Sequence, residues 1–183
     1  SGLYGGSGIP VDKDIKPIRP CMIWMDRRAR KQTQWVKDNI PLEKIFGITG
    51  NYVDSYYGFT KIMWMRDNEP DLWKNVRQFV TPKDYVIYKL TDVLATDYSS
   101  AGNIGGVFDI RKKRWSPEMC DALGIPISLF PEQITSSFHV VGGLNRRFAE
   151  ATGLLEGTPV VAGGIAAPVA QFSCGVINEG EHV

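Results

Sequence analysis

The stretch GTPVVAGGIAAPVAQFSCGV, which starts at residue 157, constrains the fold more than any other part of the chain. A short apolar run is followed by Gly163 and Gly164, and then by small residues in a run long enough for a helix. This order predicts a buried strand, a tight glycine turn and a helix, which together form the repeating unit of an α/β protein. Ligands of open α/β sheets collect beyond such strand ends, where helix N-termini present N–H groups.

The glycine turn has two interpretations that the stretch alone does not separate. It can border a ligand site, with Gly163 and Gly164 close to a phosphate, or it can simply let a helix pack on the sheet. A dinucleotide fingerprint and a Walker A loop are both excluded, because their further glycine, acidic and lysine residues are missing. The reactive position next to the turn is occupied by Ile165, Ala166 and Ala167, none of which can move a proton.

The rest of the chain alternates between strand and helix patterns. A hairpin over residues 9–25, with 21–25 as its more buried second strand, and a glycine-rich strand at 101–110 indicate a mixed sheet. Thr81 and Ser116, each followed by proline, are the expected N-caps of two helices. We therefore expect one α/β domain with a mixed sheet flanked by helices. The helices are predicted at 27–40, 41–50, 58–76 with a break at Pro70, 81–92, 116–125 and 146–154, and a further strand at 138–145.

The composition excludes several classes of partner. The chain has 183 residues, of which 43% are apolar, and a net charge of +1, so no excess positive charge favours nucleic acid or an anionic membrane. No apolar run approaches the roughly 18 residues that span a bilayer. The three cysteines and two histidines stand far apart, which argues against a metal site or a disulfide framework and favours a cytoplasmic location.

Two groups of residues suit the recognition of a sugar. Trp24 offers an apolar ring face to the C–H surface of a sugar, and Asp26 offers two acceptors to neighbouring hydroxyls. Tyr56 and Tyr57 add rings and hydroxyls just before a predicted helix. Each group also has a structural interpretation, with Trp24 in the core, Asp26 as a helix cap and the tyrosines in an ordinary turn. Their occurrence in one chain favours a carbohydrate site.

The order of several motifs resembles the FGGY carbohydrate kinases, which include xylulokinase, ribulokinases and glycerol kinase. The motifs are RPCMIWMDRRA, KIMWMRDNEPDLW, PKDYVIYKLTDVLATDYSSA, DIRKKRWSPEMCDALGI and GLLEGTPVVAGG, and the resemblance runs over residues 1–183. It implies a ribonuclease H-like domain, of the actin, sugar-kinase and Hsp70 type, that binds a small sugar or polyol. It also implies ATP-dependent phosphorylation of a sugar hydroxyl, with ATP and Mg²⁺ in the cleft to a second domain. A homodimer is one expected assembly.

The resemblance further implies that residues 1–183 are a partial N-terminal, sugar-binding domain. Family members begin with a phosphate-binding DxGT hairpin, which would precede residue 1 and complete the N-terminal strands of the sheet. The ATP-binding C-terminal domain would begin soon after Val183. We therefore expect this chain on its own to bind neither ATP nor Mg²⁺ and to be inactive.

Several sugar-binding positions follow from the resemblance. Trp24 and Asp26 match a W-x-D type of motif that lines the sugar pocket. Either Tyr56 or Tyr57 matches an aromatic residue that contacts polyol in glycerol kinase, just before a K-x-x-W helix. These four residues are therefore the predicted walls of the pocket.

Other positions depart from the xylulokinase pattern. Leu3 and Tyr4 stand where xylulokinases usually have a Gln-Met-His segment that touches sugar, and Met25 stands where they favour Asn. Both departures count against a plain xylulokinase, and Met25 also favours ribulokinase-like members. Asn103 is also expected at the sugar, although its alignment is loose because segment 99–109 is about one residue longer than usual.

The strongest departure falls on position 166. Family members have an aspartate there, which takes the proton from the attacking sugar hydroxyl, whereas this chain has Ala166. The loss of such a base commonly costs about 10²–10⁴-fold in rate. Because the surrounding motif is ordinary for a working kinase, we expect an Asp→Ala replacement in an otherwise competent site. The alternative is a non-catalytic, sugar-binding or regulatory pseudokinase that has the alanine naturally.

Overall fold

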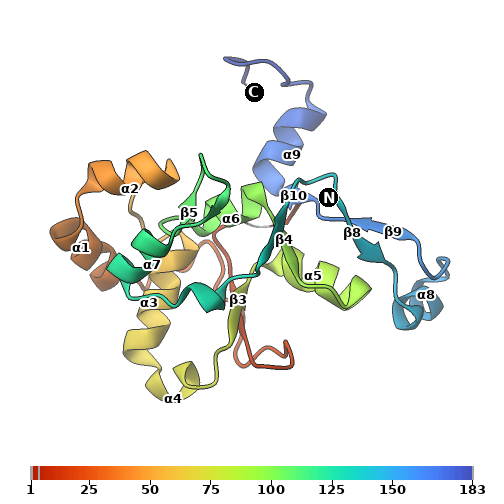
Figure 1. Cartoon of the computed structure of the whole chain (residues 1–183), viewed down its shortest axis with the longest axis horizontal. Helices are drawn as coiled ribbons and strands as arrows, with labels where there is room; N and C mark the ends of the chain where they lie inside the picture. Colours follow the sequence, from red (N-terminus) through yellow and green to blue (C-terminus); the bar gives the residue numbers. More distant parts are fainter. Residues whose placement is uncertain (1, 4, 183) are drawn as a thin grey trace.

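Helices and strands alternate along the chain in the computed structural model, which describes residues 2–3 and 5–182. This arrangement, drawn in Figure 1, confirms the α/β prediction. The strands are β1 (Gly2–Leu3), β2 (Ile9–Val11), β3 (Gln78–Val80), β4 (Ala95–Asp97), β5 (Phe108–Asp109), β6 (Arg114–Trp115), β7 (Gln133–Thr135), β8 (Val140–Gly143), β9 (Pro159–Val161) and β10 (Gly164–Ile165). The helices are α1 (Arg30–Asn39), α2 (Leu42–Thr49), α3 (Gly58–Asn68), α4 (Pro70–Trp73), α5 (Pro82–Thr91), α6 (Tyr98–Ile104), α7 (Pro117–Leu123), α8 (Arg146–Thr152) and α9 (Ala166–Ser173), with a 3₁₀ turn at Ile127–Leu129.

The strands of the described residues form five two-stranded ladders. Two of the ladders, β1 with β10 and β4 with β7, are parallel. The other three, β2 with β3, β5 with β6 and β8 with β9, are antiparallel. In Figure 1, β4 and β10 lie near the middle of the molecule, with α1 to α4 on one side and β8, β9 and α8 on the other. Both pairing directions therefore occur, as the sequence predicts for a mixed α/β arrangement.

The hydrophobic core lies on the side of α1 to α4. Phe59, Ile62 and Met65 of α3 are fully buried and pack with residues of α1, α2, α6 and α7. The side of β8, β9 and α8 adds little to this cluster, and α9 has no buried residue among those described. The region around position 166 therefore projects from a well-packed body.

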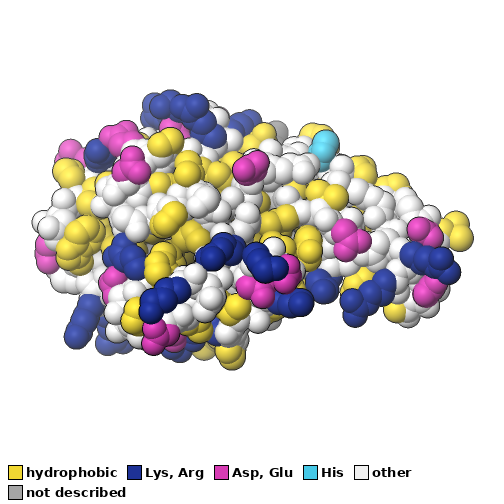
Figure 2. Space-filling model, turned by 60° about the horizontal axis from the view of Figure 1, so that its bottom comes forward, with side chains coloured by type: hydrophobic (Ala, Val, Ile, Leu, Met, Phe, Trp, Pro, Cys, Tyr) yellow, Lys and Arg dark blue, Asp and Glu magenta, His cyan; other side chains and the backbone are white. Residues whose placement is uncertain are grey.

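The surface carries charges of both signs. On the face shown in Figure 2, basic and acidic side chains are interspersed, in keeping with the net charge of +1. Within residues 2–3 and 5–182, the helices are all too short or too polar to cross a bilayer.

The predicted helix starts are confirmed where a side chain caps the backbone. Thr81 accepts a hydrogen bond from the Asp84 N–H at the start of α5, and Ser116 accepts one from the Met119 N–H at the start of α7. In both helices proline follows at the first position, where no N–H is needed. The predicted break at Pro70 is confirmed as well, because α3 ends at Asn68 and α4 begins at Pro70.

The predicted buried strand at 21–25 is wrong. Met22 alone is buried and paired, through a single bridge to Gly8, and the next three residues are exposed. The chain turns there, since the Asp26 N–H donates to the Ile23 carbonyl at 3.0 Å. The Asp26 side chain then binds Arg28, so the helix predicted from 27 begins only at Arg30.

The predicted glycine-rich strand at 101–110 is also largely wrong. Its first four residues belong to α6, and only Phe108 and Asp109 form a strand. Asp97 caps α6 by accepting hydrogen bonds from two backbone N–H groups of the first turn, which favours a helix over a strand there. Gly105 and Gly106, both with φ near +65 to +70°, then end the helix.

Candidate functional site

A cavity of about 290 Å³ lies where β10 gives way to α9. It brings together Trp24, Tyr56, Asn103 and Ala166, which are four of the positions predicted from the sequence. They come from the 23–26 turn, the turn before α3, the end of α6 and the start of α9, so segments far apart in the chain meet there. The lining consists of Gly5, Trp24, Tyr56, Asn103, Ile165, Ala166 and Ala167.

Two aromatic rings form one wall of this cavity. The ring centroids of Trp24 and Tyr56 are 6.4 Å apart, with planes at 57°. The backbone N–H of Trp24 donates to Ser7 Oγ at 2.9 Å, which fixes the turn that carries the indole ring. Because Trp24 is 41% exposed, its ring can contact a ligand while its backbone is held by the protein.

A close approach between the Gly5 backbone and the Asn103 side chain shapes another part of the lining. A Cβ atom on Gly5 would lie 2.4 Å from Asn103 Oδ1, so a residue with a side chain would displace the Asn103 amide. Asn103 Oδ1 is buried and has no hydrogen-bond partner among the described residues. An unsatisfied acceptor beside a cavity can take a hydrogen bond from a ligand hydroxyl.

The glycine turn directly precedes three residues of the cavity lining, Ile165, Ala166 and Ala167. Gly163 has φ +66°, a left-handed conformation that favours glycine, and it lines a separate cavity with Ala162 and Lys83. Gly164 is buried, and a Cβ atom there would lie 3.2 Å from Val169 Cγ2 and 3.3 Å from Ser99 Oγ. The two glycines thus shape the backbone that leads to position 166, and neither lines the cavity itself.

The other predicted site residues lie outside the cavity lining. Asp26 turns toward Arg28, whose Nε lies 2.8 Å from its carboxylate, and Tyr57 packs against the core beside Phe59. Leu3 belongs to β1 and pairs with Ile165 through the backbone, while Tyr4 falls outside the described residues.

The carboxylate of Asp26 keeps its charge through its neighbour. Burial alone would raise the pKa of Asp26, but hydrogen bonds from the Arg28 side chain and backbone N–H bring this pKa below its ordinary value. Asp26 is therefore ionised near neutral pH and acts as an acceptor beside the turn that carries Trp24.

A buried lysine that the sequence reasoning did not single out supports this region. Lys61 of α3 is fully buried, and its ammonium donates to the carbonyl oxygens of Ser55, at 2.8 Å, and Tyr56, at 2.5 Å. It therefore fixes the turn that presents Tyr56 to the cavity. In the motif KIMW the lysine stands beside apolar residues of a helix whose residues 58–63 are all buried, and this apolar setting was the available signal.

The buried Lys61 predicts a specific pH dependence of stability. Burial lowers the pKa of Lys61 from 10.5 to about 8, so the unfolded chain binds more protons than the folded chain between these values. The free energy of unfolding should therefore rise between about pH 8 and pH 10.5, by up to about 3 kcal/mol from this group. Urea unfolding at several pH values through this window measures the rise.

The control is the pH profile of unfolding of the Lys61→Met variant. Burial raises the pKa of the Cys120 thiol to about 11, which lowers stability over part of the same window in both proteins. The difference between the two pH profiles therefore isolates the lysine. Parallel profiles for the two proteins would contradict the assignment.

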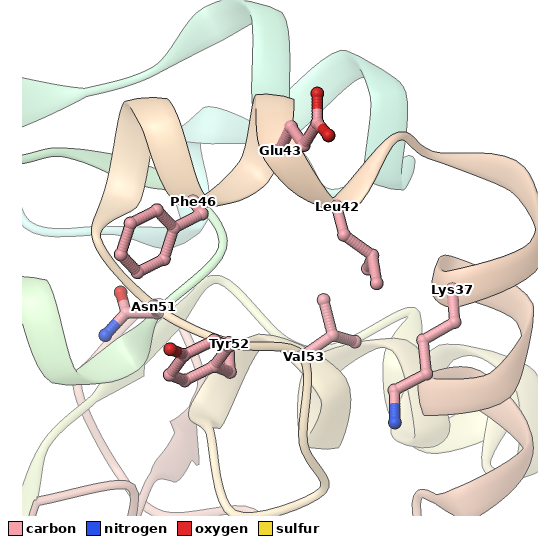
Figure 3. Close-up of a pocket in the computed structure, with 7 residues that line it drawn as sticks. All are labelled: Lys37, Leu42, Glu43, Phe46, Asn51, Tyr52 and Val53. Atoms are coloured by element: carbon pink, nitrogen blue, oxygen red, sulfur yellow. The ribbon is translucent and has the colours of Figure 1, made fainter.

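A second cavity of about 400 Å³ lies between α1, α2 and the segment 51–53. Figure 3 shows the apolar side chains of Leu42, Phe46 and Val53 around it, while the Glu43 carboxylate points away. Recognition of a sugar requires polar groups that converge on the ligand. Asn51, Tyr52 and Lys37 also border this cavity, so polar residue types alone do not favour either cavity. The cavity at position 166 is the candidate site because it brings together Trp24, Tyr56, Asn103 and Ala166, four of the positions predicted from the sequence.

The described residues also bear on metal binding. In the ranges 2–3 and 5–182, no group of three or more His, Cys, Asp or Glu side chains is arranged to hold a metal ion. The three cysteines are unbridged. The cavity at position 166 is therefore lined by neutral and aromatic side chains rather than by metal ligands.

The sequence matches the FGGY family of carbohydrate kinases, N-terminal domain, over residues 4–173. It is 34% identical over 172 residues to a xylulose kinase of Lactococcus lactis subsp. lactis, covering 93% of this chain and 34% of that protein. It is also 34% identical over 171 residues to a xylulose kinase of Bacillus subtilis, covering 93% of this chain and 32% of that protein. The chain thus spans about a third of the length of these relatives.

The fold is similar to that of solved sugar kinases. A ligand-bound xylulose kinase from Lactobacillus acidophilus superposes with a TM-score of 0.89 at 20% sequence identity. The superposition covers 96% of this chain and 36% of that structure. At this level of identity, the similarity shows a shared fold.

Proposed function

The chain belongs to the FGGY family of carbohydrate kinases, and on that basis we propose that it is the sugar-facing part of an ATP-dependent kinase of ketopentoses or polyols. Residues 1–183 would form part of the N-terminal domain, and a C-terminal domain of the intact enzyme would bind ATP. The observation that carries this proposal is the cavity at the start of α9. It joins Trp24, Tyr56 and Asn103 to position 166, where the resemblance places the catalytic base.

The cavity suggests a role for each wall. The Trp24 ring would lie against the C–H face of the sugar, and the Tyr56 hydroxyl and Asn103 amide would bind its hydroxyls. The charged Asp26 would stabilise the turn that carries Trp24, or it would bind a hydroxyl of a sugar long enough to reach it. The hydroxyl to be phosphorylated would lie next to position 166.

The fit of ATP and Mg²⁺ to the chain is incomplete. The described residues supply no metal-binding cluster, and the Gly163 turn faces a different cavity from the one at position 166. The chain's own contribution to the reaction is therefore to bind the sugar, orient its hydroxyl and exclude water. A second domain of the intact enzyme would hold the nucleotide and its metal ion.

A non-catalytic function is the second candidate, because of one residue. Ala166 has no group that can accept the proton of a sugar hydroxyl. A sugar-binding or regulatory protein would keep the cavity and tolerate this alanine. Both candidates require the sugar to bind, and they differ in whether an aspartate at position 166 creates turnover.

Sugar-dependent ADP formation by the intact two-domain protein tests the proposal. Xylulose, ribulose and glycerol would be supplied separately with ATP and Mg²⁺, and binding of each would be measured by calorimetry without ATP. The kinase proposal expects one of these compounds to bind and to be phosphorylated once position 166 carries aspartate. Binding without turnover in both forms would favour the non-catalytic candidate, and failure to bind any compound would overturn both.

The role of Trp24 gives a prediction on binding. Trp24→Ala should weaken the affinity for the sugar by roughly tenfold, because about 50 Å² of apolar contact is lost. Calorimetric titration measures the change. Trp35→Ala is the matched control, since Trp35 is 45% exposed but borders a different cavity. Equal losses of affinity in the two variants would place the sugar elsewhere.

A further inference from the structure

The backbone that leads to position 166 is held by side chains from two other helices. The ammonium of Lys83, at the start of α5, donates to the Ala162 carbonyl at 2.9 Å. The Ile165 N–H donates to Ser99 Oγ, in the first turn of α6, at 3.0 Å. Within the described residues, the only ladder of β10 is its two-residue pairing with β1. The N–H groups of Ala162 and Gly163 also donate to the carbonyls of His139 and Ser137. Ser99 is therefore the side chain that holds the end of the segment next to position 166.

One carboxylate joins the two contacts. The Ser99 hydroxyl donates to Asp97 Oδ2 at 2.5 Å, and the Lys83 ammonium lies 3.2 Å from Asp97 Oδ1. The side chains of Lys83 and Asp97 are only 6% and 2% exposed. Inside a protein, hydrogen bonds to charged groups are stronger and more directional than at the surface. Asp97 therefore links α5, α6 and the segment 162–165 into one unit.

The packing around this unit leaves little freedom. Gly164 lies so close to Ser99 that a Cβ atom would be 3.3 Å from Ser99 Oγ. Residue 166 follows Ile165 directly in the chain. A shift of that N–H is therefore transmitted directly to the position that faces the cavity.

We propose that Asp97, with Lys83 and Ser99, is a positioning unit that fixes the direction of the residue-166 side chain toward the bound sugar. The catalytic consequence rests on the proposed kinase function, whereas the structural consequence does not. A displacement of about 1 Å in a catalytic group can cost about 10²-fold in rate. None of the three residues lines the sugar cavity, so they act through residue 166 and not on the sugar.

Two neighbouring serines provide a matched test. Ser99 and Ser100 both donate their hydroxyls and their backbone N–H groups to Asp97, but only Ser99 accepts the Ile165 N–H. Ser99→Ala, Ser100→Ala and Ser99→Thr would each be made in the intact protein that carries Ala166→Asp. The readouts are hydrogen exchange of the Ile165 amide, kcat, the sugar affinity and the melting temperature.

The proposal expects a divergence between the two alanine variants. Ser99→Ala should speed exchange of the Ile165 amide by about tenfold or more and lower kcat by roughly 10–100-fold. The sugar affinity should stay within about twofold, because the cavity walls are unchanged. Ser100→Ala should leave both the exchange and kcat near the parent values, and Ser99→Thr should restore them.

Equal effects of Ser99→Ala and Ser100→Ala on exchange and kcat would overturn the proposal, since the effect would then be a general loss of the α6 cap. A parent protein without turnover would count against the kinase function alone. In that case the Ile165 exchange rates still decide: acceleration in Ser99→Ala only supports the positioning unit, and unchanged exchange rejects it.

Discussion

Replacing Ala166 with aspartate should raise sugar-dependent ATP turnover of the intact protein by about 10²–10⁴-fold. In phosphoryl transfer, the carboxylate orients the attacking hydroxyl and accepts its proton, while positioning and charge stabilisation provide the rest of the rate. Ala166 is exposed and borders the cavity, so a larger side chain can be accommodated there. Because the aspartate would act mainly in the chemical step, kcat should change much more than the affinity for the sugar.

The neighbouring alanine is the control for this gain of function. Ala167 is also exposed and borders the same cavity, but it follows position 166 on α9 and points in a different direction. Ala167→Asp adds the same charge to the cavity and should leave turnover at the parent level. An equal increase in both variants would show a general effect of negative charge, and no increase in either would favour the non-catalytic function.

Replacing Lys83 with methionine should cost about 3–5 kcal/mol of stability, because it leaves buried carboxylates without a counter-charge. The Lys83 ammonium lies 2.6 Å from Asp84 and 3.2 Å from Asp97, and both carboxylates are almost fully buried. Burial raises the pKa of Asp84, and the adjacent Lys83 ammonium opposes this rise, so loss of the lysine removes the positive partner of both carboxylates. Urea unfolding at neutral pH measures the loss.

Two further variants separate the ionic contribution from packing. Lys89 lies on the same helix as Lys83, and its ammonium faces the ring of Tyr85. Lys89→Met should change the free energy of unfolding by no more than about 0.5 kcal/mol. Adding Asp97→Asn to Lys83→Met removes one of the two buried carboxylates left without a counter-charge and should recover part of the loss. If Lys83→Met were no more destabilising than Lys89→Met, the buried cluster would not have the assigned role.

Local sequence signals predicted the parts of the fold that depend on neighbouring residues. Thr81 with Pro82 and Ser116 with Pro117 predicted the starts of α5 and α7, because a cap and a proline act within one turn. The same reasoning failed at residues 21–25, where apolar side chains suggested a buried strand. There the chain turns back, and Ile23, Trp24 and Met25 are left exposed.

For the candidate site, too, the sequence predicted some features and could not separate others. Residue types and motif order predicted Trp24, Tyr56, Asn103 and position 166, and the structure places all four around one cavity. Adjacent residues could not be separated from the sequence, because neighbours share the same local signal. Tyr57 packs against the core, while Tyr56 borders the cavity.

The sequence by itself determined the α/β class, the family, the capped helices and the alanine at position 166, where the resemblance implies a carboxylate. The tertiary structure alone decided which side chains line the cavity at position 166 and which contacts hold the backbone before it. The contact between Ser99 and the Ile165 N–H spans 66 residues, and the contact between Lys83 and the Ala162 carbonyl spans 79. Such contacts form only when distant segments pack together, and the burial that gives them their strength has no signal in the local sequence.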